Sequence, residues 1–87
     1  MKQDISVIIL TYNEEQHIER CIKSLLPFAK EIFLVDSFST DKTVEIAENL
    51  GAKIYQNPWP NNHAIQFNWG LENCPISTKW IMRMDAD

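Results

Sequence analysis

Four short apolar runs alternate with three segments of helical periodicity, and this alternation constrains the fold more than any other feature. The runs at 5–10, 32–35, 52–55 and 79–84 have the length and the apolar content of β-strands. Strands that alternate with helices in this way are joined by right-handed crossovers into a parallel sheet. We therefore expect an α/β domain with the element order β-α-β-α-β-α-β.

The three intervening segments each carry one apolar stripe at helical spacing. Pro27 ends the first segment, Gly51 is placed to terminate the second, and Pro75 follows the third. Asn13 and Gln16 have the spacing of a capping box, which predicts the start of the first helix. The predicted inward positions are Ile18, Cys21, Ile22, Leu25, Leu26, Val44, Ala47, Leu50, Ala64, Phe67 and Leu71.

Length and charge exclude several classes of protein. Eighty-seven residues are enough for one modest core, and no apolar run approaches the roughly 20 residues of a membrane helix. A net charge of −4 argues against nucleic acid as a partner. Cys21 and Cys74 are the only cysteines, so we expect neither a disulfide scaffold nor a structural zinc site. With no secretory signal at the N-terminus, we expect a cytoplasmic protein.

Polar residues follow three of the predicted strands, at 11–13, 36–37 and 85–87. The carboxyl ends of parallel strands share one edge of the sheet, which is where such folds bind ligands. Gly51 and Gly70 are the only glycines, so neither the dinucleotide-binding nor the P-loop pattern is present. A phosphate-transferring enzyme with a nucleophilic aspartate after its first strand is also disfavoured, because Thr11 stands there.

The remaining chemistry of this edge is that of carboxylates. Asp85 and Asp87 flank one residue at a strand end, where both could reach one Mg²⁺ or Mn²⁺ ion. Asp36 is suited to accept hydrogen bonds from a base or a ribose, and Tyr12 offers an aromatic face. The alternative for Asp36 is a helix cap, which is also the commoner role for Asp41.

For two tryptophans and two histidines the sequence favours structural roles. Trp59 stands between two prolines and suits a lid or a packing anchor. Trp80 is expected in the core, His17 on the surface, and His63 beside the proline-containing loop.

Three stretches together carry a family resemblance. They are Val7 to Glu15, Val35 to Thr43 with its D-S-x-S-x-D pattern, and Trp80 to Asp87. In their order and spacing they resemble the N-terminal, donor-binding half of family 2 glycosyltransferases of the GT-A fold. The first two stretches are similar to the bacterial branch that builds lipopolysaccharide core and other surface polysaccharides. The resemblance implies a three-layer, Rossmann-like parallel sheet with strand order 3-2-1-4.

This resemblance also implies a reaction and a set of binding residues. The reaction is an inverting transfer of a sugar from a nucleotide diphosphate sugar, in particular a UDP-sugar, to a hydroxyl of a carbohydrate or lipid-linked acceptor. By analogy Asp36 reads the uracil, Asp87 coordinates a Mn²⁺ or Mg²⁺ ion, and Asp85 contacts the ribose or the water shell of that metal. The residues assigned to the nucleotide sugar are Thr11, Tyr12, Glu14, Asp36, Asn68 and Asp85.

No residue is left to act as the general base that an inverting transfer needs. We therefore expect residues 1–87 to be the donor-binding part of a longer domain, cut after the D-x-D motif and inactive alone. Such a piece would leave a sheet edge open and would self-associate through it. Lipid-linked acceptors would bring the parent protein to the inner face of the cytoplasmic membrane. The alternative is a non-catalytic nucleotide-binding or protein-interaction module.

Overall fold

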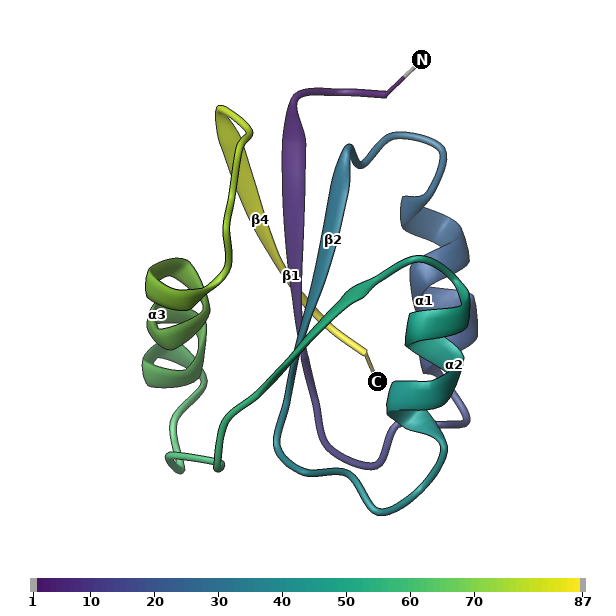
Figure 1. Cartoon of the computed structure of the whole chain (residues 1–87), viewed down its shortest axis with the longest axis vertical. Coiled ribbons are helices and arrows are strands. Elements are labelled where there is room, and N and C mark those ends of the chain that lie inside the picture. Colours follow the sequence, from purple (N-terminus) through teal and green to yellow (C-terminus); the bar gives the residue numbers. More distant parts are fainter. Residues whose placement is uncertain (1, 87) are drawn as a thin grey trace.

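The computed structural model describes residues 2–86, which form one sheet and three helices (Figure 1). The observed element order is β-α-β-α-β-α-β, so the predicted order is confirmed. In chain order the elements are β1 (Ile5–Thr11), α1 (Ile18–Leu25), β2 (Glu31–Asp36), α2 (Thr43–Asn49), β3 (Lys53–Gln56), α3 (His63–Asn73) and β4 (Trp80–Asp85).

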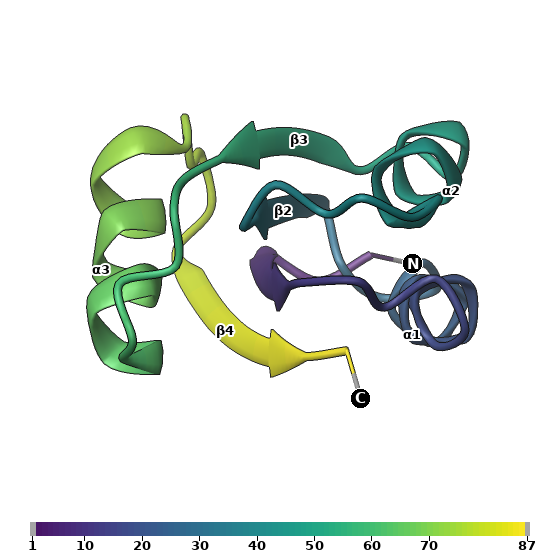
Figure 2. The same cartoon turned by 90° about the horizontal axis from the view of Figure 1, so that it is seen from below.

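The four strands are parallel and lie in the order β3-β2-β1-β4, which confirms the predicted strand order. Helices α1 and α2 cover one face of the sheet and α3 covers the other, so the domain has three layers (Figure 2). The register pairs Thr11 of β1 with Asp36 of β2, and Leu10 with Asp85 of β4. This register brings the ends of three strands to one edge, at the bottom of Figure 1.

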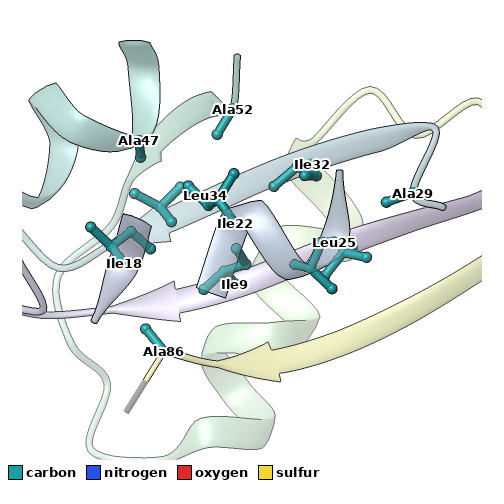
Figure 3. Packing of buried hydrophobic residues seen from close by; sticks show 11 residues of the cluster. Ile9, Ile18, Ile22, Leu25, Ala29, Ile32, Leu34, Ala47, Ala52 and Ala86 are labelled. Carbon is teal, nitrogen blue, oxygen red and sulfur yellow. The ribbon is translucent and has the colours of Figure 1, made fainter. Parts of the chain in front are cut away.

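The two central strands are buried on both faces, as their continuous apolar sequence predicts. Successive side chains of a strand point to opposite faces, so Ile9 and Leu34 pack against Ile18 and Ile22 of α1 (Figure 3). On the other face, Ile8, Leu10, Phe33 and Val35 form a second cluster beneath α3. These two clusters hold the strand ends in fixed positions.

Helix α1 begins later than the capping box predicts. Its N-terminal flanking residue is His17, which makes no side-chain capping bond. Asn13 has a φ of 52°, a left-handed conformation that asparagine tolerates, and its side chain bonds to another loop. The predicted capping box is therefore wrong, because Asn13 joins two loops instead of starting a helix.

Of the three inward positions predicted for helix α3, only Phe67 packs against the second cluster. Ala64 and Leu71 are exposed, and the buried positions of the helix are Gln66 and Gly70. A Cβ atom on Gly70 would lie 3.1 Å from Cγ2 of Val35, so the helix backbone approaches the sheet closely at this residue. The predicted stripe missed this face because a glycine and a glutamine form its centre.

Strand β4 lies at one edge of the sheet and is largely exposed. The exposed fraction of Trp80 is 62%, so its predicted place in the core is wrong. Within residues 2–86 no element covers this part of the strand, and Ile81 and Arg83 beside it are exposed as well. None of the helices in the same range is long and apolar enough to span a bilayer.

Glu31 anchors the start of β2 to the segment that leads into β4. Its Oε1 accepts hydrogen bonds from Ser6 Oγ (2.6 Å) and from the Ser77 backbone N–H (3.1 Å), and its Oε2 accepts one from Ser77 Oγ (2.9 Å). The bond from the Ser6 side chain is the main cause that holds the pKa of Glu31 below its ordinary value of 4.5, against the opposing effect of burial. Further hydrogen bonds from Ser77 and the charge of Lys53 act in the same direction.

We expect this network to make the free energy of unfolding depend on pH. A carboxyl group with a lowered pKa stabilises the folded state above its ordinary pKa, and the effect is lost as the pH falls through the folded-state value. The Glu31→Gln variant should therefore lose less stability than the wild type when the pH is lowered from 5 to 3. Urea unfolding at both pH values measures this. Equal losses in the two proteins would show that Glu31 does not contribute.

Candidate functional site

A cavity of about 380 Å³ opens at the carboxyl ends of the strands. Such edges of parallel sheets are where α/β folds bind ligands. Four of the predicted site residues, Thr11, Tyr12, Glu14 and Asp85, lie on its wall. The complete lining is Leu10, Thr11, Tyr12, Glu14, Ser37, Trp59, His63, Gln66 and Asp85.

The loop after β1 and the loop after β2 are held together by hydrogen bonds. Asn13 Oδ1 accepts from the Thr40 N–H (2.8 Å), and the Asn13 N–H donates to Ser39 Oγ (2.8 Å). The Glu14 N–H donates to Thr43 Oγ1 (2.8 Å) at the start of α2. These hydrogen bonds fix the backbone of the loop that presents the side chains of Tyr12 and Glu14 to the cavity.

Asp41 supports the same pair of loops. Its Oδ2 accepts from the Glu15 N–H (3.2 Å), and its Oδ1 accepts from the backbone N–H of Thr43 (2.9 Å) and from the Thr43 hydroxyl. Burial raises the pKa of Asp41, but these hydrogen bonds lower it more, so the pKa lies below its ordinary value. Asp41 thus binds Thr43, the first residue of α2, but the N-cap position of that helix is occupied by Lys42, so the capping role considered from the sequence is met only in part.

Asp36 does not line the cavity, although the resemblance assigns it to the uracil. Its side chain is fully buried, with Oδ1 bonded to Thr11 Oγ1 (2.7 Å) and to Ser39 Oγ, and Oδ2 bonded to the Ser39 N–H (2.7 Å). Both carboxylate oxygens are used inside the protein, so in this structure the side chain is not presented to a base. It supports Thr11, which does reach the wall.

Two predicted site residues remain. One lies away from the cavity wall, and the other is outside the part of the chain that the structure describes. Asn68 is exposed on α3 and is not among the residues that line the cavity. Asp87 lies outside the described residues 2–86. Asp85 is exposed at the end of β4, on the wall.

Five lining residues were not assigned to the site from the sequence: Leu10, Ser37, Trp59, His63 and Gln66. The Trp59 ring meets the His63 ring edge-on, with 4.9 Å between the ring centroids. The tryptophan between two prolines was a signal, since a rigid loop holding an aromatic residue suits a wall or a lid. Gln66 gave a weaker signal, since it is one of three amide side chains in α3, together with Asn68 and Asn73.

Gln66 is fully buried and makes three hydrogen bonds. Its Nε2 donates to Ser37 Oγ (3.1 Å) and to the Asn57 carbonyl (3.3 Å), and its Oε1 accepts from Asn57 Nδ2 (2.8 Å). One side chain therefore connects α3, the end of β2 and the loop that carries Trp59.

The cavity wall carries carboxylate oxygens, and Oε1 of one of the carboxylates, that of Glu14, lies 3.1 Å from Nδ1 of His17. Glu14 and Asp85 bring carboxylates to the wall, and oxygen ligands of this kind are preferred by Mg²⁺ and Mn²⁺. Among residues 2–86, no group of three metal-ligating side chains converges. Such ions are commonly held by one or two carboxylates together with substrate phosphates, so two protein ligands are compatible with this chemistry.

The fold and the cavity define a class: a Rossmann-like α/β domain with a ligand site beyond the carboxyl ends of its strands. The sequence matches Glycosyl transferase family 2 over residues 6–87. It is 44% identical to an uncharacterized glycosyltransferase of Rickettsia bellii, covering 100% of this chain and 29% of that protein. It is 33% identical to the glycosyltransferase SunS of Bacillus subtilis, covering 91% of this chain and 19% of that protein. The chain belongs to glycosyl transferase family 2.

A solved structure agrees with this membership. Glucosyl-3-phosphoglycerate synthase from Mycobacterium tuberculosis, solved with Mn²⁺, UDP and glucosyl-3-phosphoglycerate, superimposes with a TM-score of 0.79 at 28% identity. The match covers 95% of this chain and 33% of that one. The chain thus spans about a third or less of the length of the relatives described here.

Proposed function

We propose that this chain is the donor-binding part of an inverting glycosyltransferase that uses a UDP-sugar. The observation that carries the proposal is the cavity at the carboxyl ends of β1, β2 and β4 in a family 2 domain. Tyr12, whose exposed fraction is 57%, offers an aromatic face to a base, and Asp85 lies on the wall at the end of β4. The mycobacterial neighbour binds UDP and Mn²⁺, which supports the same donor here.

The proposed roles follow the chemistry of the wall. Thr11 and Tyr12 border the nucleoside, Glu14 closes one side, and Asp85 together with Asp87 would hold a Mn²⁺ or Mg²⁺ ion. The cation, when bound, stabilises the negative charge of the leaving diphosphate. In the transfer, a bond forms between the acceptor oxygen and the anomeric carbon, while the bond from that carbon to the diphosphate oxygen breaks. UDP leaves with the electron pair, and the acceptor proton goes to a general base.

That base is not among the residues assigned here, so we propose that it lies in a part of the parent protein that follows Asp87. Residues 1–87 are then the N-terminal nucleotide-sugar-binding part of the domain. For the whole protein we propose a role in lipopolysaccharide or surface-polysaccharide synthesis at the cytoplasmic face of the membrane. The support is the similarity of residues 7–15 and 35–43 to that branch of the family.

A binding titration tests the proposal on the full-length protein that we propose contains this chain. UDP should bind in the presence of Mn²⁺ and at least tenfold more weakly after the metal is chelated. The Asp87→Ala variant should show the weak, metal-independent affinity in both conditions, while Asp4→Ala, at the other end of the sheet, should behave as the wild type. Affinity that is independent of Mn²⁺ in all three proteins would refute the metal-dependent donor site.

We expect the isolated 87-residue chain to self-associate. The edge of β4 that faces away from β1 has no partner strand within residues 2–86, and Trp80 and Ile81 beside it are 62% and 41% exposed. An unpaired strand edge that carries apolar side chains can form hydrogen bonds with the same edge of a second chain. Sedimentation velocity of the chain alone should show dimers or larger species, and Ile81→Lys should reduce them. A monodisperse monomer at high concentration would contradict this expectation.

A further inference from the structure

Arg83 is a charged residue in the middle of β4, and the proposed function gives it no role. Its neighbours Met82 and Met84 pack against the cluster between the sheet and α1. Successive side chains of a strand point to opposite faces, so Arg83 points to the face of the sheet on which α3 lies. The register agrees with this, because Arg83 lies beside Ile8, which belongs to the cluster beneath α3.

Helix α3 leaves this face of β4 open. At Gly70 the helix packs on Ile8 of β1 and Val35 of β2. Ile81, on the same face of β4 as Arg83, is 41% exposed, and Arg83 is exposed as well. Parallel sheets occur almost only with both faces covered. The face of β4 that carries Ile81 and Arg83 therefore lacks its cover within residues 2–86.

Arg83 also lacks a counter-charge in this part of the chain. Two ion pairs are found among residues 2–86, and neither of them involves Arg83 or its neighbour on the same face, Asp85. Arginine is not deprotonated in proteins, and a buried charge is stable only when it is paired. Carboxylates accept from a guanidinium through two parallel hydrogen bonds. A segment that covers Arg83 is therefore expected to bring a carboxylate to it.

The length of the relatives indicates which segment this is. The chain spans about a third or less of the length of the relatives described above, so their domains continue well past the matched region. β4 ends at Asp85, and polypeptide that continues from there starts beside the open face (Figure 1). A tethered segment has a high effective concentration at a neighbouring surface, which favours it over a separate partner.

We propose that the part of the parent protein that follows Asp87 covers Ile81 and Arg83, and that one of its carboxylates pairs with the Arg83 guanidinium. The inference rests on the proposed function, in which residues 1–87 belong to a longer domain, and it adds how the two parts are joined. A rise of about 3.3 Å per residue places Arg83 about 7 Å from Asp85 along β4. The pair therefore anchors the following segment beside the proposed cation site.

Chemical modification of the full-length protein tests whether Arg83 is covered. Phenylglyoxal reacts with accessible guanidinium groups, and mass spectrometry gives the rate for each arginine. Without nucleotide or metal, Arg83 should react about tenfold more slowly than Arg20, which is exposed on α1, and both should react equally after unfolding in urea. Equal rates in the folded protein would overturn the inference. Protection that disappears on dilution would also overturn it, since a second copy would then be the cover.

Two matched variants of the full-length protein test for the carboxylate. Arg83→Met should lower the urea midpoint of unfolding by about 1 M at pH 8, because it leaves a buried carboxylate without its partner. Burial raises the pKa of such a group, so it takes up a proton as the pH falls, and the loss should be smaller at pH 5. Arg20→Met should leave the midpoint unchanged at both pH values. A loss in Arg83→Met that is equal at the two pH values would overturn the proposed pair.

If Arg83→Met fails to fold, Arg83→Lys decides the same point, because it keeps the charge and should retain most of the wild-type midpoint. An Arg83→Lys variant that also fails to fold would show that the charge is not what the site needs. The modification rates are measured without UDP, so an Arg83 as reactive as Arg20 in a protein that binds UDP overturns this inference alone. Absence of UDP binding refutes the proposed donor site, whatever the reactivity of Arg83.

Discussion

Replacing Asp36 by alanine is expected to lower the free energy of unfolding by about 3 kcal/mol, because buried donors would lose their acceptor. Thr11 Oγ1 and the Ser39 N–H both donate to this fully buried carboxylate over 2.7 Å. Neither donor has another acceptor at hand among residues 2–86, and each unsatisfied group costs about 1–3 kcal/mol. The loop after β2 would lose its side-chain attachment to Thr11, while the Ser37 N–H would still donate to the Thr11 carbonyl (3.0 Å).

Urea unfolding of the full-length protein measures this effect, and Asp85→Ala is the matched control. Asp85 also ends a strand at the same edge, but it is exposed and has no hydrogen bond to its side chain among the described residues. Its replacement should change the free energy of unfolding by less than about 0.5 kcal/mol. If Asp36→Ala were as stable as Asp85→Ala, the structural role assigned to Asp36 would be wrong.

The same control variant should lose catalysis. We expect Asp85→Ala to lower the rate of Mn²⁺-dependent hydrolysis of the UDP-sugar donor by about 100-fold or more, since a cation that stabilises a leaving diphosphate contributes several kcal/mol. UDP release from UDP-glucose, UDP-galactose and UDP-N-acetylglucosamine measures the rate without a known acceptor. Asp4→Ala removes an aspartate remote from the cavity and should retain the wild-type rate. An Asp85→Ala variant with wild-type hydrolysis would remove Asp85 from the site.

Much of the fold could be predicted from the sequence, because each strand carries its own signal. The β-branched run of β1 and the apolar run of β2 are buried on both faces, and such strands follow from local composition. Once the strands are parallel, their carboxyl ends share an edge. Thr11, Tyr12 and Asp85 are found on the cavity wall for this reason.

The residues that were misplaced depend on contacts between distant segments. Asn13 has the spacing of a helix cap, but it bonds to Thr40 in another loop. Asp36 and Ser37 are neighbours and both are buried, and only the packing decides that Ser37 lines the cavity while Asp36 does not. Gln66 is a polar residue on a buried helix face. Its burial is explained by its hydrogen bonds to Asn57 and Ser37, which are distant from it in the sequence.

The central claim is that the cavity at the carboxyl ends of the strands holds the nucleotide of a UDP-sugar. A crystal structure of the full-length protein with UDP and Mn²⁺ tests it most directly. Our account predicts the uracil beside Tyr12 and the diphosphate with its cation at Asp85. UDP bound at another place, such as the lysine-lined hollow formed by Lys2, Lys30 and Lys53 at the opposite end of the sheet, would contradict it.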